Sequence, residues 1–306
     1  MPRTKLLLRT QAVHRVRIIL LTVFCRFLTG FFVDVQILNY ALTLEHLENA
    51  FYSGGLANYS QDDFAKAGFA PFVRGRFEQI AAHEASHVAL LQQALGDQAT
   101  HPCNYTFPYD TVQGFVILSA TFEQVGTSAY TGASKYISDK ENLLVSASIL
   151  STEARQASWV EADVRKGSPW GTAYETPLDF NQAFTLASPF ITSCPSSNPE
   201  LPATAYPALS TNGTAIAGGT IGLNYTAPSS NDTLYAIFLN GLTPTVTALN
   251  LTKTQVAIPD TLRGFTYLYI STDSTGNNIS KTVAGPTVLD LSFDPNNQPA
   301  LLNSQF

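Results

Sequence analysis

Hydrophobic periodicity changes once along this chain, and the change divides it into a helical part and a β part. Apolar residues recur at helical spacing through residues 34–166, whereas short β-branched and aromatic runs alternate with polar residues beyond about Tyr206. A repeat of 3.6 residues places apolar side chains on one face of a helix, and a repeat of two places them on one face of a strand. The sequence therefore predicts two domains in a chain of 306 residues, one helical and one all-β.

The helical part divides into four segments of helix length. The Gly54–Gly55 pair is expected to stop the first helix, Gly96 to end the second, and Asp110 to cap the third. The four helices are expected within residues 34–56, 71–95, 110–137 and 140–166. Because most of their connections are short, we predict an antiparallel four-helix bundle over residues 34–167.

The β part follows a segment of different composition. Residues 168–203 are rich in Pro, Ser and Thr and are expected to form a covering segment and linker, with a short helix at Asp179–Leu186. Residues 204–306 contain six or seven short strand-like runs separated by Gly, Asn, Asp and Pro clusters. This pattern predicts an Ig-like or fibronectin-like β-sandwich. The region holds no histidine or cysteine and only eight charged side chains, so we expect any catalytic residues in the bundle.

Residues 1–33 have the order of a secretory signal, in which basic residues precede an apolar run. Five basic side chains are followed by "IILLTVFCRFLTGFFV" at residues 18–33. Arg26 interrupts that run, and no small-x-small cleavage site precedes Asp34. An uncleaved membrane anchor and a wrongly assigned first exon are therefore the alternatives to a signal or targeting segment.

Glycosylation acceptors and cysteines also indicate the secretory pathway. Of three cysteines, Cys25 lies in the targeting segment, which leaves Cys103 and Cys194 as an even pair. In an oxidising compartment we expect these two to form one disulfide, and the alternative is two unrelated buried thiols. N-x-S/T acceptors occur at seven positions: Asn58, Asn104, Asn212, Asn224, Asn231, Asn250 and Asn278. The sequence therefore predicts a secreted, extracellular glycoprotein.

The charge distribution bears on possible partners. Six of the 17 lysines and arginines precede Asp34, the first acidic residue, and the rest of the chain carries 11 basic against 23 acidic side chains. A surface of this charge repels phosphate backbones, so nucleic acid is not expected to be a partner.

Each predicted helix carries at least one acid in an apolar context. Burying a carboxylate is costly unless it is paired or bound to a metal, and acids from four facing helices with an E-x-x-H pair are typical of di-iron or di-manganese bundles. The E-x-x-H pair stands in the second helix, within "HEASH". Glu45 is favoured over its neighbour Glu48 as a ligand, which leaves Glu48 as a bridging group or a neighbour of the ligands. The candidate metal ligands are Glu45, Glu48, Glu84, His87, Glu123 and Glu153.

One position departs from the di-metal pattern. Gln156 stands in "EARQ", where a second E-x-x-H would place a histidine. Three outcomes follow: the second metal position is weakened, His83 or His46 compensates, or no metal binds. Two tyrosines, Tyr52 and Tyr130, are interpreted as core residues rather than as radical relays. Three further acids fall outside the inward face and are expected to face solvent: Glu78, Glu141 and Glu161.

Several stretches resemble a known family. "DVQILNYALTLEHLENAFYSGGL", "HEASHVALL", "FEQVGTSAYTGA", "LSTEARQASWV", "HPCNYTFPY" and "ITSCP" are similar to the ferritin-like family of fungal secreted stress-response proteins and plant desiccation-related proteins. The resemblance covers residues 34–200. It implies a ferritin-like bundle, an extracellular location, induction under stress, and ligands at Glu45, Glu84, Glu123 and Glu153 with His87.

Two functions remain open from the sequence. The first is a secreted stress- or desiccation-related glycoprotein with a di-metal carboxylate site, complete or degenerate, that holds two Fe or Mn ions and acts on O₂ or peroxide. The alternative is a non-catalytic extracellular or cell-wall glycoprotein that binds no metal. In that case the β-sandwich would dock to a cell-wall polymer or another extracellular protein.

Overall fold

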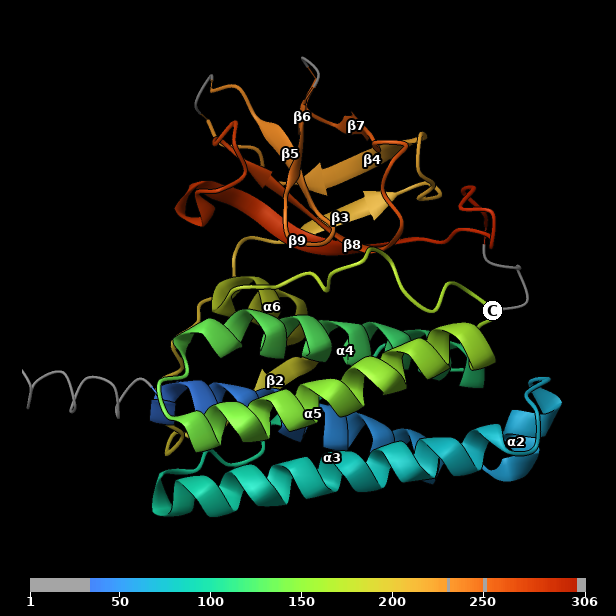
Figure 1. Cartoon of the computed structure of the whole chain (residues 1–306), viewed down its shortest axis with the longest axis vertical. Coiled ribbons are helices and arrows are strands. Elements are labelled where there is room, and N and C mark those ends of the chain that lie inside the picture. The colour runs from blue at the N-terminus through green and yellow to red at the C-terminus, as the bar shows by residue number, and fades with distance from the viewer. Residues whose placement is uncertain (1–33, 230–231, 250–251, 302–306) are drawn as a thin grey trace, which may run out of the picture.

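The structure is a computed structural model that describes residues 34–229, 232–249 and 252–301. Four long helices lie side by side, and antiparallel sheets follow them along the chain (Figure 1). The long helices cover residues 34–58, Val73–Leu95 (α3), Val112–Ala133 (α4) and Lys140–Trp159 (α5). The predicted helical region is confirmed. The segment 1–33, on which the targeting prediction rests, lies outside the described residues.

Local sequence sets the ends of these helices, with two differences from the prediction. Gly96 ends α3 as expected, but Thr111 rather than Asp110 caps α4, because its side chain accepts the backbone N–H of Gly114. The Gly54–Gly55 pair does not stop the first helix, which continues to residue 58. A Cβ on Gly55 would lie 2.3 Å from the Phe115 ring, so this glycine permits close helix packing there.

At one end of the bundle, two aspartates join the first helix to the turn between α4 and α5. Asp139 caps α5 by accepting the backbone N–H groups of Glu141 and Asn142. Asp34 accepts the backbone N–H groups of Ser138 and Asp139 at 2.9 and 2.8 Å, and so fixes the start of the first helix against the α4–α5 turn. Burial acts to raise the pKa of Asp34, but these hydrogen bonds outweigh burial and lower the pKa.

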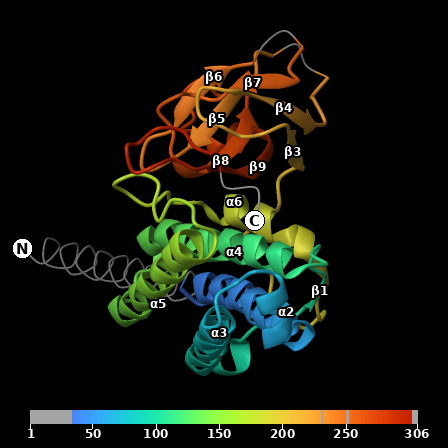
Figure 2. The ribbon, with the colours of Figure 1, turned by 90° about the vertical axis from the view of Figure 1, so that its right-hand side faces the viewer.

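A short pair of strands and a short helix cover the bundle. β1 (Asn104–Tyr105) pairs antiparallel with β2 (Ile191–Ser193), and α2 (Gln61–Lys66) precedes α3. The short helix expected in the covering segment is present as α6, Phe180–Ala187, with Asp179 as its N-cap. Figures 1 and 2 show α6 between α4 and the sheets, with α3 on the far side of the bundle.

The described residues of the C-terminal region form two antiparallel sheets. One has the strand order β3-β4-β7 and the other β6-β5-β8-β9. A single apolar cluster draws on both sheets, with Ile221 and Val256 from the first and Phe238, Leu268 and Ile270 from the second. The strands are Leu209–Asn212 (β3), Thr220–Tyr225 (β4), Tyr235–Leu239 (β5), Thr245–Ala248 (β6), Gln255–Ala257 (β7), Gly264–Ser271 (β8) and Thr282–Leu291 (β9).

The two regions are in direct contact. Tyr267 of β8 is fully buried, and its hydroxyl donates to the backbone carbonyl of Gln124 at 3.1 Å and lies 2.8 Å from Ser128 Oγ on α4. The backbone N–H of Leu178 donates to the Ser128 carbonyl at 3.0 Å. A Cβ on Gly132 would lie 1.7 Å from the Leu178 carbonyl oxygen, so the covering segment packs directly on the α4 backbone. The β8–β9 sheet therefore rests on the helical region through α4 and α6.

Candidate metal centre

Four buried side chains from three helices meet inside the bundle. Glu45 comes from the first helix, Glu84 and His87 from α3, and Glu153 from α5, and one ligand atom of each lies within 4.8 Å of the others. His87 Nδ1 is 3.1 Å from Glu84 Oε2 and 3.3 Å from Glu45 Oε2. The i,i+3 spacing puts Glu84 and His87 on one face of α3, as the sequence indicated.

Two further carboxylates lie beside these four. Glu123 of α4 is 3% exposed, and its Oε1 accepts a hydrogen bond from the Tyr52 hydroxyl. Glu48 Oε1 and Glu153 Oε2 lie 3.0 and 2.6 Å from the position that a Cβ on Gly126 would occupy. The structure thus brings all six predicted residues into one neighbourhood. We call them the carboxylate cluster: Glu45, Glu48, Glu84, His87, Glu123 and Glu153.

Gly126 belongs to this site, and sequence reasoning missed it. It stands in the interior of α4, three residues after Glu123, and any side chain there would enter the space of two carboxylates. A glycine inside an apolar helix lowers helix stability relative to alanine, so its presence calls for a packing reason. That signal was available in "FEQVG", and the structure shows its reason: Gly126 makes room for Glu48 and Glu153.

Buried oxygens without hydrogen-bond partners show whether the cluster fits a metal. Within the described part of the chain, both oxygens of Glu153 are buried without a hydrogen-bond partner, and the buried Oε2 of Glu45 has only its ion-pair contact with His87 Nδ1 at 3.3 Å. An unpaired buried carboxylate oxygen is strongly unfavourable, and in proteins such groups are paired or coordinate metals. Carboxylates with one imidazole are also ligands that Fe and Mn accept. The donor set therefore fits a bound metal ion.

The protonation of the cluster follows from its burial. Burial, together with the neighbouring charges of Glu48 and Glu45, raises the pKa of Glu153 well above its ordinary value. Burial and the Glu45 charge do the same for Glu48. The pKa of Glu84 rises to about 7, mainly through burial, against the opposing hydrogen bond with His87. Without metal, several of these carboxyl groups therefore retain protons at neutral pH.

His87 responds in the opposite way to the same carboxylates. Burial acts to lower its pKa, but the contacts with Glu45 and Glu84 outweigh burial and raise the pKa to about 10. A metal ion on Nδ1 would have to displace that proton.

Two tyrosines hold cluster carboxylates in place. The Tyr130 hydroxyl donates to Glu45 Oε1, and the Tyr52 hydroxyl donates to Glu123 Oε1. Both side chains are buried, as expected of core residues. The sequence did not indicate these hydrogen bonds, because a tyrosine at a helical core position gives no signal of where its hydroxyl points.

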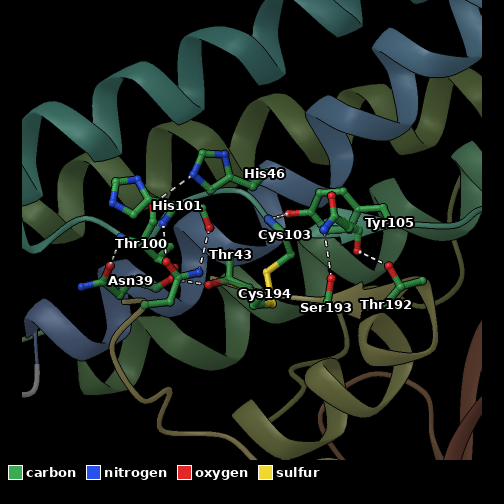
Figure 3. Close-up of a disulfide and its surroundings, with 12 residues drawn as sticks. Asn39, Thr43, His46, Thr100, His101, Cys103, Tyr105, Thr192, Ser193 and Cys194 are labelled. Atoms are coloured by element: carbon green, nitrogen blue, oxygen red, sulfur yellow. Dashed lines mark hydrogen bonds between the residues drawn. A yellow bond between two sulfur atoms is a disulfide. The ribbon is translucent and has the colours of Figure 1, made fainter. Parts of the chain in front are cut away.

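Gln156 lies against the cluster rather than apart from it. It is 6% exposed, and its Nε2 lies 3.2 Å from Glu84 Oε1 and 3.1 Å from His83 Nδ1. Among the contacts of the described residues, Gln156 is the link between His83 and the carboxylate cluster. His46 points elsewhere: its Nε2 lies 3.2 Å from the Thr100 carbonyl, beside the disulfide (Figure 3). Neither histidine replaces the expected imidazole.

The prediction that three acids outside the inward face are solvent-facing is right for two and wrong for one. Glu78 and Glu141 are exposed, but Glu161 is only 3% exposed. The helix continues beyond Trp159 as a π-helical turn, Val160–Val164. There Glu161 pairs with Arg165, which also lies 3.0 Å from Asp290 Oδ2 of β9. The C-terminal region covers this helix end, which helical periodicity alone does not reveal.

The predicted disulfide is present. Cys103 and Cys194 are bonded across a separation of 91 residues, next to the β1–β2 pair (Figure 3). The predicted glycosylation sites remain predictions, and Asn231 and Asn250 lie outside the described residues. The other five asparagines are exposed: Asn58, Asn104, Asn212, Asn224 and Asn278. Within the described ranges, no helix combines the length and apolar character needed to cross a membrane.

Fold and site together define a ferritin-like domain with a buried carboxylate cluster. Residues 33–166 match the model of the Ferritin-like domain, which confirms the resemblance for the helical region. The chain is also similar to Protein rds1 of Schizosaccharomyces pombe, with 28% identity over 176 residues. That alignment covers 58% of this chain and 44% of the relative, so the match spans less than half of the relative's length.

Proposed function

We propose that this chain is a secreted glycoprotein whose ferritin-like bundle holds two Fe or Mn ions and acts on dioxygen or peroxide. The observation that carries the proposal is the buried carboxylate of Glu153, both oxygens of which have no hydrogen-bond partner among the described residues and which converges with Glu45, Glu84 and His87 within 4.8 Å. Such ions, when bound, would supply redox chemistry and Lewis acidity toward oxygen species.

The protein residues divide into ligands and groups that orient ligands. Glu45, Glu84, His87 and Glu153 would hold the first ion, since their ligand atoms already converge. Glu123 and Glu48 would serve a second ion together with the shared carboxylates. The hydroxyls of Tyr52 and Tyr130 fix one oxygen each of Glu123 and Glu45, which leaves the other oxygens for metal.

Several features support an extracellular setting for this centre. The Cys103–Cys194 disulfide is of the kind that persists in oxidising compartments. Five of the seven glycosylation acceptors are exposed asparagines within the described residues. The shared apolar cluster between two antiparallel sheets is typical of a β-sandwich, and we propose that this region docks to a cell-wall polymer or to another extracellular protein.

One observation favours a second candidate, a non-catalytic glycoprotein with a polar bundle interior. Gln156 occupies the position of the second imidazole and hydrogen-bonds Glu84, as a purely structural network would require. In that case protonated carboxyl groups and tyrosine hydroxyls would hold the helices in register without metal.

Metal analysis of protein purified from culture medium without chelators separates the two candidates. The di-metal function predicts about two Fe or Mn ions per chain, the count typical of such bundles. Glu84→Ala should abolish binding, whereas Glu78→Ala, on the exposed face of the same helix, should retain it. Metal content far below one ion per chain, in protein that also fails to take up added Fe²⁺ or Mn²⁺, would contradict the di-metal function.

A further inference from the structure

A groove between α3 and α5 leads to the carboxylate cluster. Its cavity volume is about 610 Å³, within the range of small-molecule sites in proteins. His83 and Gln156 line it, and Gln156 is the residue whose amide contacts Glu84. The groove and the cluster are therefore separated by a single side chain.

Gln156 presents an unsatisfied acceptor at this boundary. Gln156 is only 6% exposed, and its Oε1 has no hydrogen-bond partner within the described chain. Its Nε2, by contrast, lies within hydrogen-bond distance of both Glu84 and His83. A buried amide oxygen without a donor is unfavourable, and a water molecule at the inner end of the groove, beyond a bound ligand, would satisfy it.

The walls of the groove combine positive charge with apolar surface. Arg76 and Arg155 contact only neutral side chains by hydrogen bonds, Gln79 at 2.7 Å and Thr152 at 3.3 Å, and neither is ion-paired within the described ranges. Against them stands one lining carboxylate, Asp163.

The apolar wall is formed by three large side chains. Phe72 is 54% exposed at the start of α3, Ile80 lies about two turns further along that helix, and Trp159 packs edge-on against Phe77 at 5.3 Å. An exposed aromatic beside a groove is typical of a surface that contacts a ligand.

We infer that this groove binds a small organic carboxylate, with its anionic group between Arg76 and Arg155 and its apolar body along Phe72, Ile80 and Trp159. Guanidinium groups match carboxylates in geometry and charge. A metal cation would be repelled by the two arginines, and an inorganic anion would leave the apolar wall uncovered. With the metal centre of the proposed function one side chain away, the ligand is presented to that centre at Gln156.

Calorimetric titration of benzoate into the full-length, metal-free protein tests binding. Benzamide, which has the same shape without the charge, and inorganic phosphate, which has charge without an apolar body, serve as comparators. We expect benzoate to bind about tenfold or more tightly than either, as loss of a charged hydrogen bond predicts. Absent benzoate binding, or equal binding of benzamide, would overturn the inference.

Matched variants test whether benzoate binds in this groove. The double variant Arg76→Gln/Arg155→Gln should weaken benzoate binding about tenfold or more, since it removes both cations. Lys66→Gln removes an exposed cation of α2 outside the groove and should leave the affinity unchanged. An unchanged affinity in the double variant would show that benzoate binds elsewhere.

A metal-loaded measurement tests presentation to the centre and separates the two proposals. In Mn²⁺-loaded protein, benzoate should alter the electron paramagnetic resonance spectrum, and Gln156→Leu should reduce that change. If benzoate binds but no metal is taken up, only the proposed function fails. If metal binds and benzoate leaves its spectrum unchanged, the inference of presentation fails while the metal centre stands.

Discussion

Glu153 of α5 and Gly126 of α4 face each other so closely that a Cβ on Gly126 would lie 2.6 Å from Glu153 Oε2. The same Cβ would lie 3.0 Å from Glu48 Oε1. The space occupied by two carboxylates of the cluster thus depends on the absence of a side chain on the neighbouring helix.

Gly126→Ala should therefore weaken metal binding while keeping the fold. The new methyl group displaces Glu153 from its position beside Glu45, and losses of about 10–100-fold in metal affinity are typical when ligand support is disturbed. Equilibrium titration with Fe²⁺ or Mn²⁺ measures this effect. Gly75→Ala is the matched control: nothing lies within 4 Å of a Cβ there, so stability should rise by about 0.5–1 kcal/mol and metal affinity should not change. Equal metal affinity in Gly126→Ala would exclude Glu153 from the site.

The metal-free protein should lose stability as the pH rises above about 4.5. Burial raises the folded-state pKa of Glu48 and Glu153, so above about pH 4.5 the folded state binds more protons than the unfolded state. His87 acts in the same direction, because its stabilising protonation is complete below about pH 6.5 and is lost as the pH rises through 10. The free energy of unfolding should fall by at least about 1 kcal/mol between roughly pH 5.5 and pH 8.

Denaturant unfolding across this pH range checks that expectation. Glu153→Gln should flatten the profile, since it removes one ionisable group from the cluster. Bound metal should reverse the trend, because protons and metal compete for the same ligands and binding tightens as the pH rises. A pH-independent stability of the metal-free protein would show that the cluster is solvated rather than buried.

Much of the helical region and of the site followed from local spacing. Glu84 and His87 share a face because three residues nearly complete a helical turn, and the apolar context of Glu123 and Glu153 indicated inward acids. These signals depend on one helix at a time. Roles that depend on a partner helix were not predictable. The glycine in "FEQVG" signals a packing constraint, but the carboxylates that it makes room for are known only once α5 is placed. The contacts of Gln156 are likewise known only once His83 and Glu84 lie beside it.

The errors share the same physical origin. Glu161 was expected to face solvent because helical periodicity places it off the inward face, but Arg165 and Asp290 bury it where the C-terminal region meets the bundle. The Gly54–Gly55 pair is expected to end a helix, yet Gly55 lies inside one, where its missing side chain leaves room for the Phe115 ring. In both cases tertiary contacts decided between alternatives that local propensity left close in free energy.

Removal of the disulfide should destabilise the protein without dismantling the metal site. Cys103 and Cys194 close a loop of 91 residues, and loss of such a bridge costs about 2–5 kcal/mol. Cys103→Ser/Cys194→Ser should therefore unfold at lower denaturant concentration while its metal stoichiometry stays that of the wild type. Thiol titration of the protein recovered from culture medium provides the control. Two reactive thiols in that material would contradict both the bridge and the oxidising compartment.

Gln156→His should strengthen the weaker of the two metal positions. The substitution restores E-x-x-H to α5, and imidazole is a better ligand for Fe or Mn than a neutral amide. The side chain already contacts Glu84 Oε1 at 3.2 Å, so an imidazole nitrogen can approach the cluster without backbone movement. Stepwise titration with Mn²⁺ in the presence of a competing chelator should show the second equivalent binding at least about tenfold more tightly than in the wild type. Gln156→Asn shortens the side chain without adding a nitrogen ligand and should not reproduce this gain. If Gln156→His leaves the affinity for the second Mn²⁺ equivalent unchanged, residue 156 is not a ligand of the second ion. Gln156 would then act only as a lining residue of the groove.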